Sequence, residues 1–162
     1  KLSDCLDDLD IHVAEKAAFA LSRSPLPRAA ELLGLHLTKT LVPVRLQCAI
    51  ARALVWMATP VALRHLRQAM SQLDPAARQE AIAALGRLEA IELRPVAVEM
   101  LFALLDEGDV SASARAAIAH SLGQLQDLRA LPVLETLARD ADERVQWHAI
   151  AAIERLTAAG DR

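Results

Sequence analysis

Apolar residues recur along this chain at helical spacing, in stretches that short polar breaks separate. In the clearest stretch, four apolar residues fall at i, i+4, i+8 and i+11, which is one face of a helix: Val145, Ala149, Ile153 and Leu156. Asp142 precedes them and is a good N-cap, because its carboxylate accepts hydrogen bonds from the free backbone N–H groups of the first turn. Strand-like alternation of apolar and polar residues is lacking. The pattern therefore predicts an all-α chain.

The same helix start recurs along the sequence at steps of 31 to 37 residues. Each start has a leading residue three positions before the first apolar one, and most of these leading residues are good N-caps. The leading residues are Asp10, Leu41, Asp74, Ser111 and Asp142, of which Leu41 is the exception. A proline marks each helix that follows: Pro27, Pro60, Pro95 and Pro132. A period of this length predicts a solenoid of helical hairpins.

These signals place helices of two types in alternation. We expect first-type helices at Ile11–Ser22, Pro43–Met57, Pro75–Leu88, Ala112–Leu125 and Glu143–Leu156. We expect second-type helices at Pro27–Leu37, Pro60–Leu73, Arg94–Leu105 and Leu128–Arg139. Lys1–Leu9 is interpreted as the tail of another second-type helix, and Thr157–Arg162 as a frayed end. We predict a single repeat domain over residues 1–162, with repeats starting near residues 10, 41, 74, 111 and 142 and half-repeats at both ends.

Two repeats share a short motif near the end of the first helix: Ala84-Leu85-Gly86-Arg87-Leu88 and Ser121-Leu122-Gly123-Gln124-Leu125. With the D-x-x-V start and an L-P-x-L-x-x-L segment from Leu131, this motif resembles the short HEAT repeat, also called PBS-lyase HEAT-like. The resemblance covers nearly the whole chain and is strongest over Asp74–Leu88 and Ser111–Leu156. It implies a right-handed α-α superhelix whose second helices line a concave surface, and glycines that let helices approach closely. It also implies protein binding more than chemistry, although some members attach bilins to phycobiliproteins or remove them.

Composition agrees with a helical domain of ordinary size. The 162 residues are 54% hydrophobic and include no tyrosine, two phenylalanines and two tryptophans. The formal net charge is −3, so nothing indicates a nucleic-acid partner. No apolar run approaches the ~18 residues of a membrane span, so we expect no membrane insertion. The start lacks a signal-peptide pattern, and a chain that opens on Lys1 rather than Met fits a piece of a longer protein.

Cysteines and histidines are the residues most able to carry chemistry. Cys5 and Cys48 form no C-x-x-C pair, so we expect free thiols in a reducing, cytoplasmic compartment. The histidines are His12, His36, His65, His120 and His148. Deoxyhypusine hydroxylases, which have a similar HEAT-like fold, bind iron through His-Glu pairs, but no histidine here precedes a glutamate. Carboxylate pairs such as Asp7-Asp8 lie at helix ends, where capping explains them. We therefore expect no catalytic residue, no metal and no cofactor.

The function we expect is a non-enzymatic protein-binding scaffold, and a phycobilin lyase-like role is the alternative. Binding residues are expected on a ridge of the second-type helices, where side chains point away from the neighbouring helices. They are Arg28, Glu31, Arg64, Arg67, Gln68, Glu99, Phe102, Glu135 and Arg139. This ridge mixes both signs of charge, which suits a protein partner more than nucleic acid. For a bilin, Arg28, Arg64 and Arg67 would supply charge for the propionates, but aromatic residues are scarce. A solvated ridge without a partner also stays open.

Two further expectations concern apolar side chains. Phe102 shares a helical stripe with Pro95, Glu99 and Asp106, so we expect it to project beside Glu99, and burial in the core is the alternative. Both terminal helices lack a neighbour, so we expect partly exposed apolar side chains at the ends: Leu2, Leu6, Leu9, Trp147, Ile150 and Ile153. Such uncovered ends predict self-association or further repeats.

Overall fold

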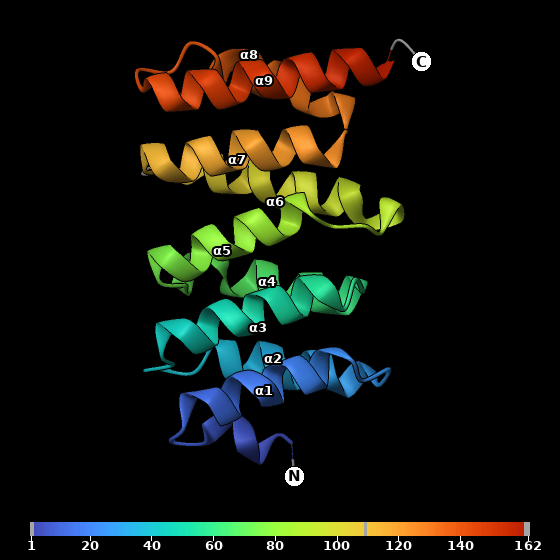
Figure 1. Ribbon diagram of the computed structural model, residues 1–162, viewed down its shortest axis with the longest axis vertical. Helices are drawn as coiled ribbons and strands as arrows, with labels where there is room; N and C mark the ends of the chain where they lie inside the picture. Colours follow the sequence, from blue (N-terminus) through green and yellow to red (C-terminus); the bar gives the residue numbers. More distant parts are fainter. Residues whose placement is uncertain (1, 109, 161–162) are drawn as a thin grey trace. The chain divides into compact units, whose positions relative to one another are not determined.

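The fold is built from helices throughout residues 2–108 and 110–160, the part that the computed structural model describes, side chains of 159 and 160 excepted (Figure 1). The first-type helices are α1 (Ile11–Ser22), α3 (Val44–Trp56), α5 (Pro75–Gly86), α7 (Ala112–Leu125) and α9 (Glu143–Gly160). The second-type helices are α2 (Pro27–Leu37), α4 (Pro60–Ala69), α6 (Arg94–Asp106) and α8 (Leu131–Leu137). Short 3₁₀ helices are η1 (Asp4–Asp7), η2 (Met70–Gln72), η3 (Ile91–Leu93) and η4 (Leu128–Ala130). Within these ranges there is no strand, so the predicted all-α fold of helical hairpins is confirmed.

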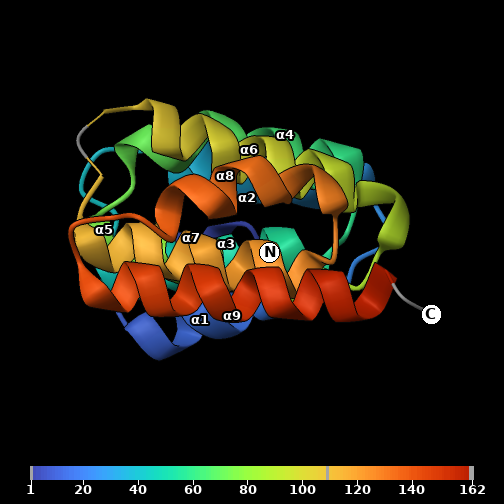
Figure 2. The same cartoon turned by 90° about the horizontal axis from the view of Figure 1, so that it is seen from above.

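The chain divides into two units, Lys1–Ala84 (unit 1) and Leu85–Arg162 (unit 2), and each is described by itself. In unit 1, α1 packs on α3 and α2 packs on α4, and α1 also contacts α2 and α3 contacts α4. The two types of helix therefore form two layers within the unit (Figure 2). Its largest fully buried side chains are Leu33, Ile50, Leu54, Leu63, Leu66 and Ile82.

In unit 2, α9 packs on both α7 and α8, and α6 contacts α7. The largest fully buried side chains are Leu85, Met100, Leu101, Ile118, Leu122 and Leu125. Gly123 allows α7 and α9 to approach closely, because a Cβ atom built on it would lie 2.7 Å from the Cβ atom of Ala152. A Cβ atom on Gly86 would lie 2.8 Å from the Cα atom of Ser121 on α7. The glycine of the repeated motif is therefore a requirement of helix packing.

Side-chain caps begin four of the first-type helices. In each, a carboxylate or hydroxyl oxygen accepts a backbone N–H of the first turn at 2.9 to 3.3 Å, and the caps are Asp10, Asp74, Ser111 and Asp142. Before α3 the backbone at Leu41 has a φ of 64°, a strained value for a leucine, and its side chain is 99% exposed. Gln47 holds this loop, since its side-chain amide donates to the carbonyl of Val42 and accepts the N–H of Asp74, both at 2.9 Å.

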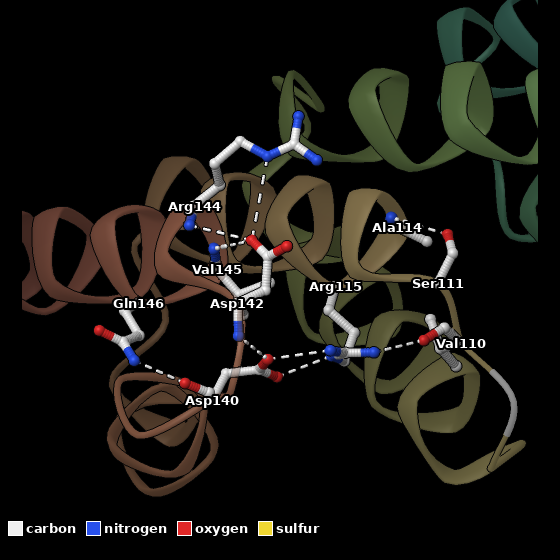
Figure 3. Close-up of polar contacts among 9 residues, drawn as sticks. All are labelled: Val110, Ser111, Ala114, Arg115, Asp140, Asp142, Arg144, Val145 and Gln146. Carbon is white, nitrogen blue, oxygen red and sulfur yellow. Dashed lines mark hydrogen bonds and ion pairs between the residues drawn. The ribbon is translucent and has the colours of Figure 1, made fainter.

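A polar network fixes the break before α9 (Figure 3). The Arg115 guanidinium on α7 donates to the two carboxylate oxygens of Asp140 at 2.7 and 2.9 Å, and also to the carbonyl of Val110. Asp140 accepts the backbone N–H of Asp142 at 2.9 Å, and its carbonyl accepts the side-chain amide of Gln146. The hydrogen bond from Arg115 is the main reason why the pKa of Asp140 is lowered. The network thereby holds Asp142 where it caps α9.

The predicted starts of the first-type helices are confirmed within one residue, since only α3 begins later, at Val44. The predicted helix Pro60–Leu73 instead ends at Ala69 and continues as η2. The carbonyls of Met70 and Ser71 there accept the Arg78 guanidinium at 3.0 and 2.9 Å, which stabilises the turn into α5. The predicted helix Leu128–Arg139 is split into η4 and the shorter α8.

Both ends of the chain differ from the prediction, and Lys1, Asp161 and Arg162 lie outside the described residues. The N-terminal segment is not an α-helical tail. Only Asp4–Asp7 is helical, as η1, and it packs on α1, so Leu6 is 3% exposed and its predicted exposure is wrong. The fraying predicted from Thr157 is also wrong, because α9 runs to Gly160. The Thr157 hydroxyl donates to the carbonyl of Ile153 at 3.0 Å, and alanines favour the added turn.

Candidate protein-binding surfaces

The outer sides of α2 and α4 carry all five predicted binding residues of unit 1. The two helices lie against each other, and Gly34 leaves the room that the His65 side chain occupies. Leu33 and Leu63 point into the core and are fully buried, so the opposite sides of both helices face outward. We define the α2–α4 face by its exposed side chains, which are Arg28, Glu31, Leu35, Arg64, Arg67 and Gln68.

The α2–α4 face is positively charged, and its charged side chains have no partner in the described part of unit 1. It carries three arginines against the single carboxylate of Glu31. Among the described residues, no hydrogen bond or ion pair involves the side chains of Arg28, Arg64 or Arg67. A guanidinium keeps its charge at all relevant pH values and matches a carboxylate with two parallel hydrogen bonds. This face is therefore able to pair with carboxylates supplied from outside.

The corresponding helices of unit 2 satisfy more of their own charge. The Glu99 carboxylate on α6 accepts a hydrogen bond from Arg129 at 3.1 Å, and Arg129 also donates to Asp127 at 2.7 Å. The hydrogen bond from Arg129 is the largest cause of the lowered pKa of Asp127. Glu135 of α8 and Arg139 just beyond it are exposed, and neither has a side-chain partner in the described part of the chain. Glu99 is therefore less available to a partner than the arginines of the α2–α4 face.

Phe102 is neither fully exposed nor fully buried, so its burial is intermediate between the two expected outcomes. Glu99 and Asp106 on its helical stripe are exposed, as the stripe predicts, but the Phe102 side chain itself is half-buried. Its neighbour Leu101 is fully buried and Leu104 is 4% exposed. Phe102 therefore adds to the packing of α6 and still presents part of its ring to solvent.

A groove between α1 and α3 was not predicted from the sequence. It encloses about 540 Å³ and is lined by Glu15, Lys16, Phe19, Ser22, Arg45, Ala49, Arg52, Ala53 and Trp56. We call it the α1–α3 groove. Phe19 is 57% exposed and Trp56 73% exposed, so one phenylalanine and one tryptophan stand at the same concavity. Binding was expected only on second-type helices, whereas both aromatic residues occupy outward positions of first-type helices.

Cations at the rim of the α1–α3 groove are more exposed than the carboxylates that pair with them. Arg45 donates to both oxygens of Glu15 at 3.2 and 2.9 Å, and these side chains are 61% and 23% exposed. Arg52 lies 3.6 Å from Glu80, and these side chains are 54% and 31% exposed. Lys16 is exposed and has no ion pair within the described residues. The groove therefore presents positive charge to solvent.

The thiols and imidazoles suggest structural roles. Cys5 and Cys48 are free and half-buried, and burial raises the pKa of the Cys48 thiol, which disfavours the reactive thiolate. His36 is buried and its pKa is lowered mainly by that burial. Across the described ranges, no three His, Cys, Asp or Glu side chains gather as a metal-binding group. In the same part of the chain, none of the helices is long and apolar enough to cross a membrane.

Apolar side chains at both ends of the chain are exposed, as predicted for most of them. Leu2 is 50% exposed and Leu9 fully exposed, while Trp147 and Ile150 on α9 are 66% and 48% exposed. Ile153 is half-buried. Whether these side chains support self-association or further repeats stays a prediction.

Comparison with known proteins identifies the family. The sequence matches the profile of HEAT repeats over residues 68–154, more than half of its length, and the chain belongs to the HEAT-repeat proteins. Its fold is similar to a chain in the complex of CpcE and CpcF of phycocyanin lyase from Nostoc sp. PCC7120, with a TM-score of 0.66 and 22% sequence identity. That match covers 96% of this chain and 64% of the other, so this chain spans less than two thirds of its length.

A second similar structure is that of an engineered protein. The TM-score is 0.47 at 27% identity, and the match covers 97% of this chain and 78% of the other. No curated protein sequence matches this chain.

Proposed function

We propose that this chain is a protein-binding scaffold that holds an acidic segment of a partner on the α2–α4 face. The observation that carries the proposal is the presence on this face of three exposed arginines, which have no partner among the described residues, beside a single glutamate. Charge-assisted hydrogen bonds from arginine to carboxylates are stronger than those between neutral groups, and their planar geometry orients the partner.

Other features of the face fit such a partner. Leu35 is 63% exposed between the charged positions, so a partner is expected to bring an apolar side chain beside its carboxylates. Glu31 disfavours carboxylates on one side and so contributes to the orientation of the partner. In unit 2, we propose that Glu99, Phe102, Glu135 and Arg139 form a second stretch of binding surface on α6 and α8.

Charge reversal on α4 tests this function. Peptides are selected from a random display library on the wild-type chain, and their affinities are then measured for Arg64→Glu/Arg67→Glu. We expect acidic peptides to be enriched and to bind the variant at least about tenfold more weakly, since tenfold corresponds to ~1.4 kcal/mol. The control is Arg23→Glu, which reverses an exposed arginine at the end of α1, outside the face. Enrichment of neutral peptides, or equal binding of every selected peptide to the double variant, would contradict the proposal.

Bilin handling is the second candidate function. The similarity in fold to a chain of a phycocyanin lyase complex favours it, and Arg28, Arg64 and Arg67 would pair with bilin propionates. Any enzymatic activity of the chain would belong to this candidate. A free bilin added to the chain is then expected to shift its visible absorbance, and Arg64→Glu/Arg67→Glu is expected to abolish the shift. A scaffold without this function leaves the absorbance unchanged.

A further inference from the structure

The α1–α3 groove is lined by small buried side chains and by two exposed aromatic ones. Ser22, Ala49 and Ala53 line it together with Phe19 of α1 and Trp56, the last residue of α3. The Ser22 hydroxyl donates to the backbone carbonyl of Phe19 at 2.7 Å, so this polar group of the lining already has a hydrogen-bond partner. A concavity of this size lined by aromatic and aliphatic groups is typical of sites that bury an apolar group of a ligand.

The charge around this groove further restricts which chemical groups of a ligand it favours. The carboxylates of Glu15 and Glu80 are largely covered, whereas the guanidinium groups of Arg45 and Arg52 that pair with them are more than half exposed. Lys16 adds a third cation, which has no ion pair in the part of the chain that is described. A ligand that approaches the rim meets cations first, so carboxylates are favoured over cationic groups.

We propose that the α1–α3 groove binds an acidic segment of a partner protein, whose apolar side chain lies between Phe19 and Trp56 while flanking carboxylates pair with Lys16, Arg45 and Arg52. Trp and Arg are the residues most often found at the energetic centre of protein interfaces. The inference goes beyond the α2–α4 face, because it assigns a binding role to first-type helices. The two surfaces have no residue in common, so either one can fail without the other.

Fluorescence of Trp56 gives a direct test. The chain has two tryptophans, so Trp147→Phe leaves Trp56 as the sole reporter. The probe is a ten-residue acetylated peptide with a central Leu-Phe pair and glutamates on both sides. We expect binding to shift the Trp56 emission to shorter wavelength, because the bound peptide removes water from a side chain that is 73% exposed.

Matched variants separate the apolar and the charged contributions. Phe19 is 57% exposed, so the fold should tolerate its truncation. Phe19→Ala is expected to lower the affinity for the probe about tenfold or more. Lys16→Glu/Arg52→Glu, or a probe with glutamines in place of its glutamates, is expected to have a similar effect. Circular dichroism checks that each variant stays folded, and Arg64→Glu/Arg67→Glu is expected to leave binding of this probe unchanged.

Four results would overturn the inference. The glutamine probe could bind as tightly as the acidic one, or Phe19→Ala could leave the affinity unchanged. Loss of binding in Arg64→Glu/Arg67→Glu would place the probe on the α2–α4 face instead. An emission shift that grows with the concentration of the chain in the absence of the peptide would show that a second copy of the chain occupies the groove.

Discussion

The contact between neighbouring first-type helices, which we call the seam, differs between the two units. In unit 2, Gly123 of α7 lies so close to Ala152 of α9 that a Cβ atom would have no room. The same repeat position in α1 of unit 1 is Ser22, and the partner position in α3 is again an alanine, Ala51. Ser22 lines the α1–α3 groove. A glycine at this position thus allows helix contact, whereas a side chain there accompanies an opening at the surface.

Charge on the second-type helices also differs between the units. The α2–α4 face of unit 1 has three arginines that no described residue of the unit pairs with, whereas Glu99 in unit 2 is paired with Arg129. Unit 1 therefore carries the two positively charged surfaces for which we propose a binding role, and unit 2 pairs Glu99 of its own proposed surface internally.

The largest effect is expected from adding one methyl group at the closed seam. Gly123→Ala is expected to lower the free energy of unfolding by about 2 kcal/mol, because overpacking typically costs ~1–3 kcal/mol and outweighs the better helix propensity of alanine. The new methyl group would lie 2.7 Å from the Cβ atom and 2.9 Å from the Cα atom of Ala152. Because the Cα atom belongs to the backbone of α9, it cannot move away by a change of rotamer. Urea denaturation followed by circular dichroism measures the change.

Ser22→Ala is the matched control, since it introduces alanine at the same repeat position of unit 1. It removes only a hydroxyl that bonds to the carbonyl of Phe19, so we expect a change below about 1 kcal/mol. Equal losses for the two variants would show that the seams do not differ in packing.

The contrast between the seams also shows how far the sequence determines the fold. Helix starts are local, because a cap such as Asp10 or Ser111 needs only the backbone of its own first turn. These starts are therefore predicted within one residue. The exposure of Leu6 was predicted wrongly, since it depends on how η1 packs against α1, a contact that periodicity does not specify.

The proposed binding surfaces were predictable only in part. The outward positions of α2 and α4 follow from helical periodicity, so the exposure of Arg28, Arg64 and Arg67 could be anticipated. The α1–α3 groove could not, because Phe19 and Trp56 belong to different repeats and meet only through the packing of α1 on α3. The signal in the sequence was an aromatic residue at an outward position of a first-type helix.

A smaller difference between the units is expected at the apolar residues of α6 and α2. Phe102→Ala is expected to cost about 1–2 kcal/mol, less than the ~3–5 kcal/mol of a fully buried phenylalanine, because its ring is half-buried. Leu35→Ala on α2 is expected to cost less than about 0.5 kcal/mol, since Leu35 is 63% exposed. Urea denaturation of both variants gives the comparison. A loss at Phe102 as large as that of a core residue would remove it from the proposed binding surface of unit 2.

The smallest effect on stability is expected from lowering the pH, which protonates one hydrogen-bonded carboxylate in each unit. The pKa of Asp140 is lowered mainly by its hydrogen bond from Arg115, and the pKa of Asp7 mainly by its hydrogen bond from Lys39. A lowered pKa in the folded state means that the ionised carboxylate stabilises the fold above the ordinary value of 3.8, and that this contribution is lost as the pH falls below it.

The Asp140 carboxylate is 11% exposed, whereas that of Asp7 is 59% exposed, so solvent screens the pair in unit 1 much more. Asp140→Asn is therefore expected to lower the melting temperature at about pH 7, and Asp7→Asn to lower it less. The asparagine oxygen can still accept the N–H of Asp142, whereas the variant loses the negative charge and one of the two acceptors of the Arg115 pair. Melting curves between about pH 2.5 and 7 test this, because the difference between wild type and Asp140→Asn should vanish once the carboxylate is protonated. A difference that stays constant over this range would mean that the network in Figure 3 stabilises the fold through its geometry and not through its charge.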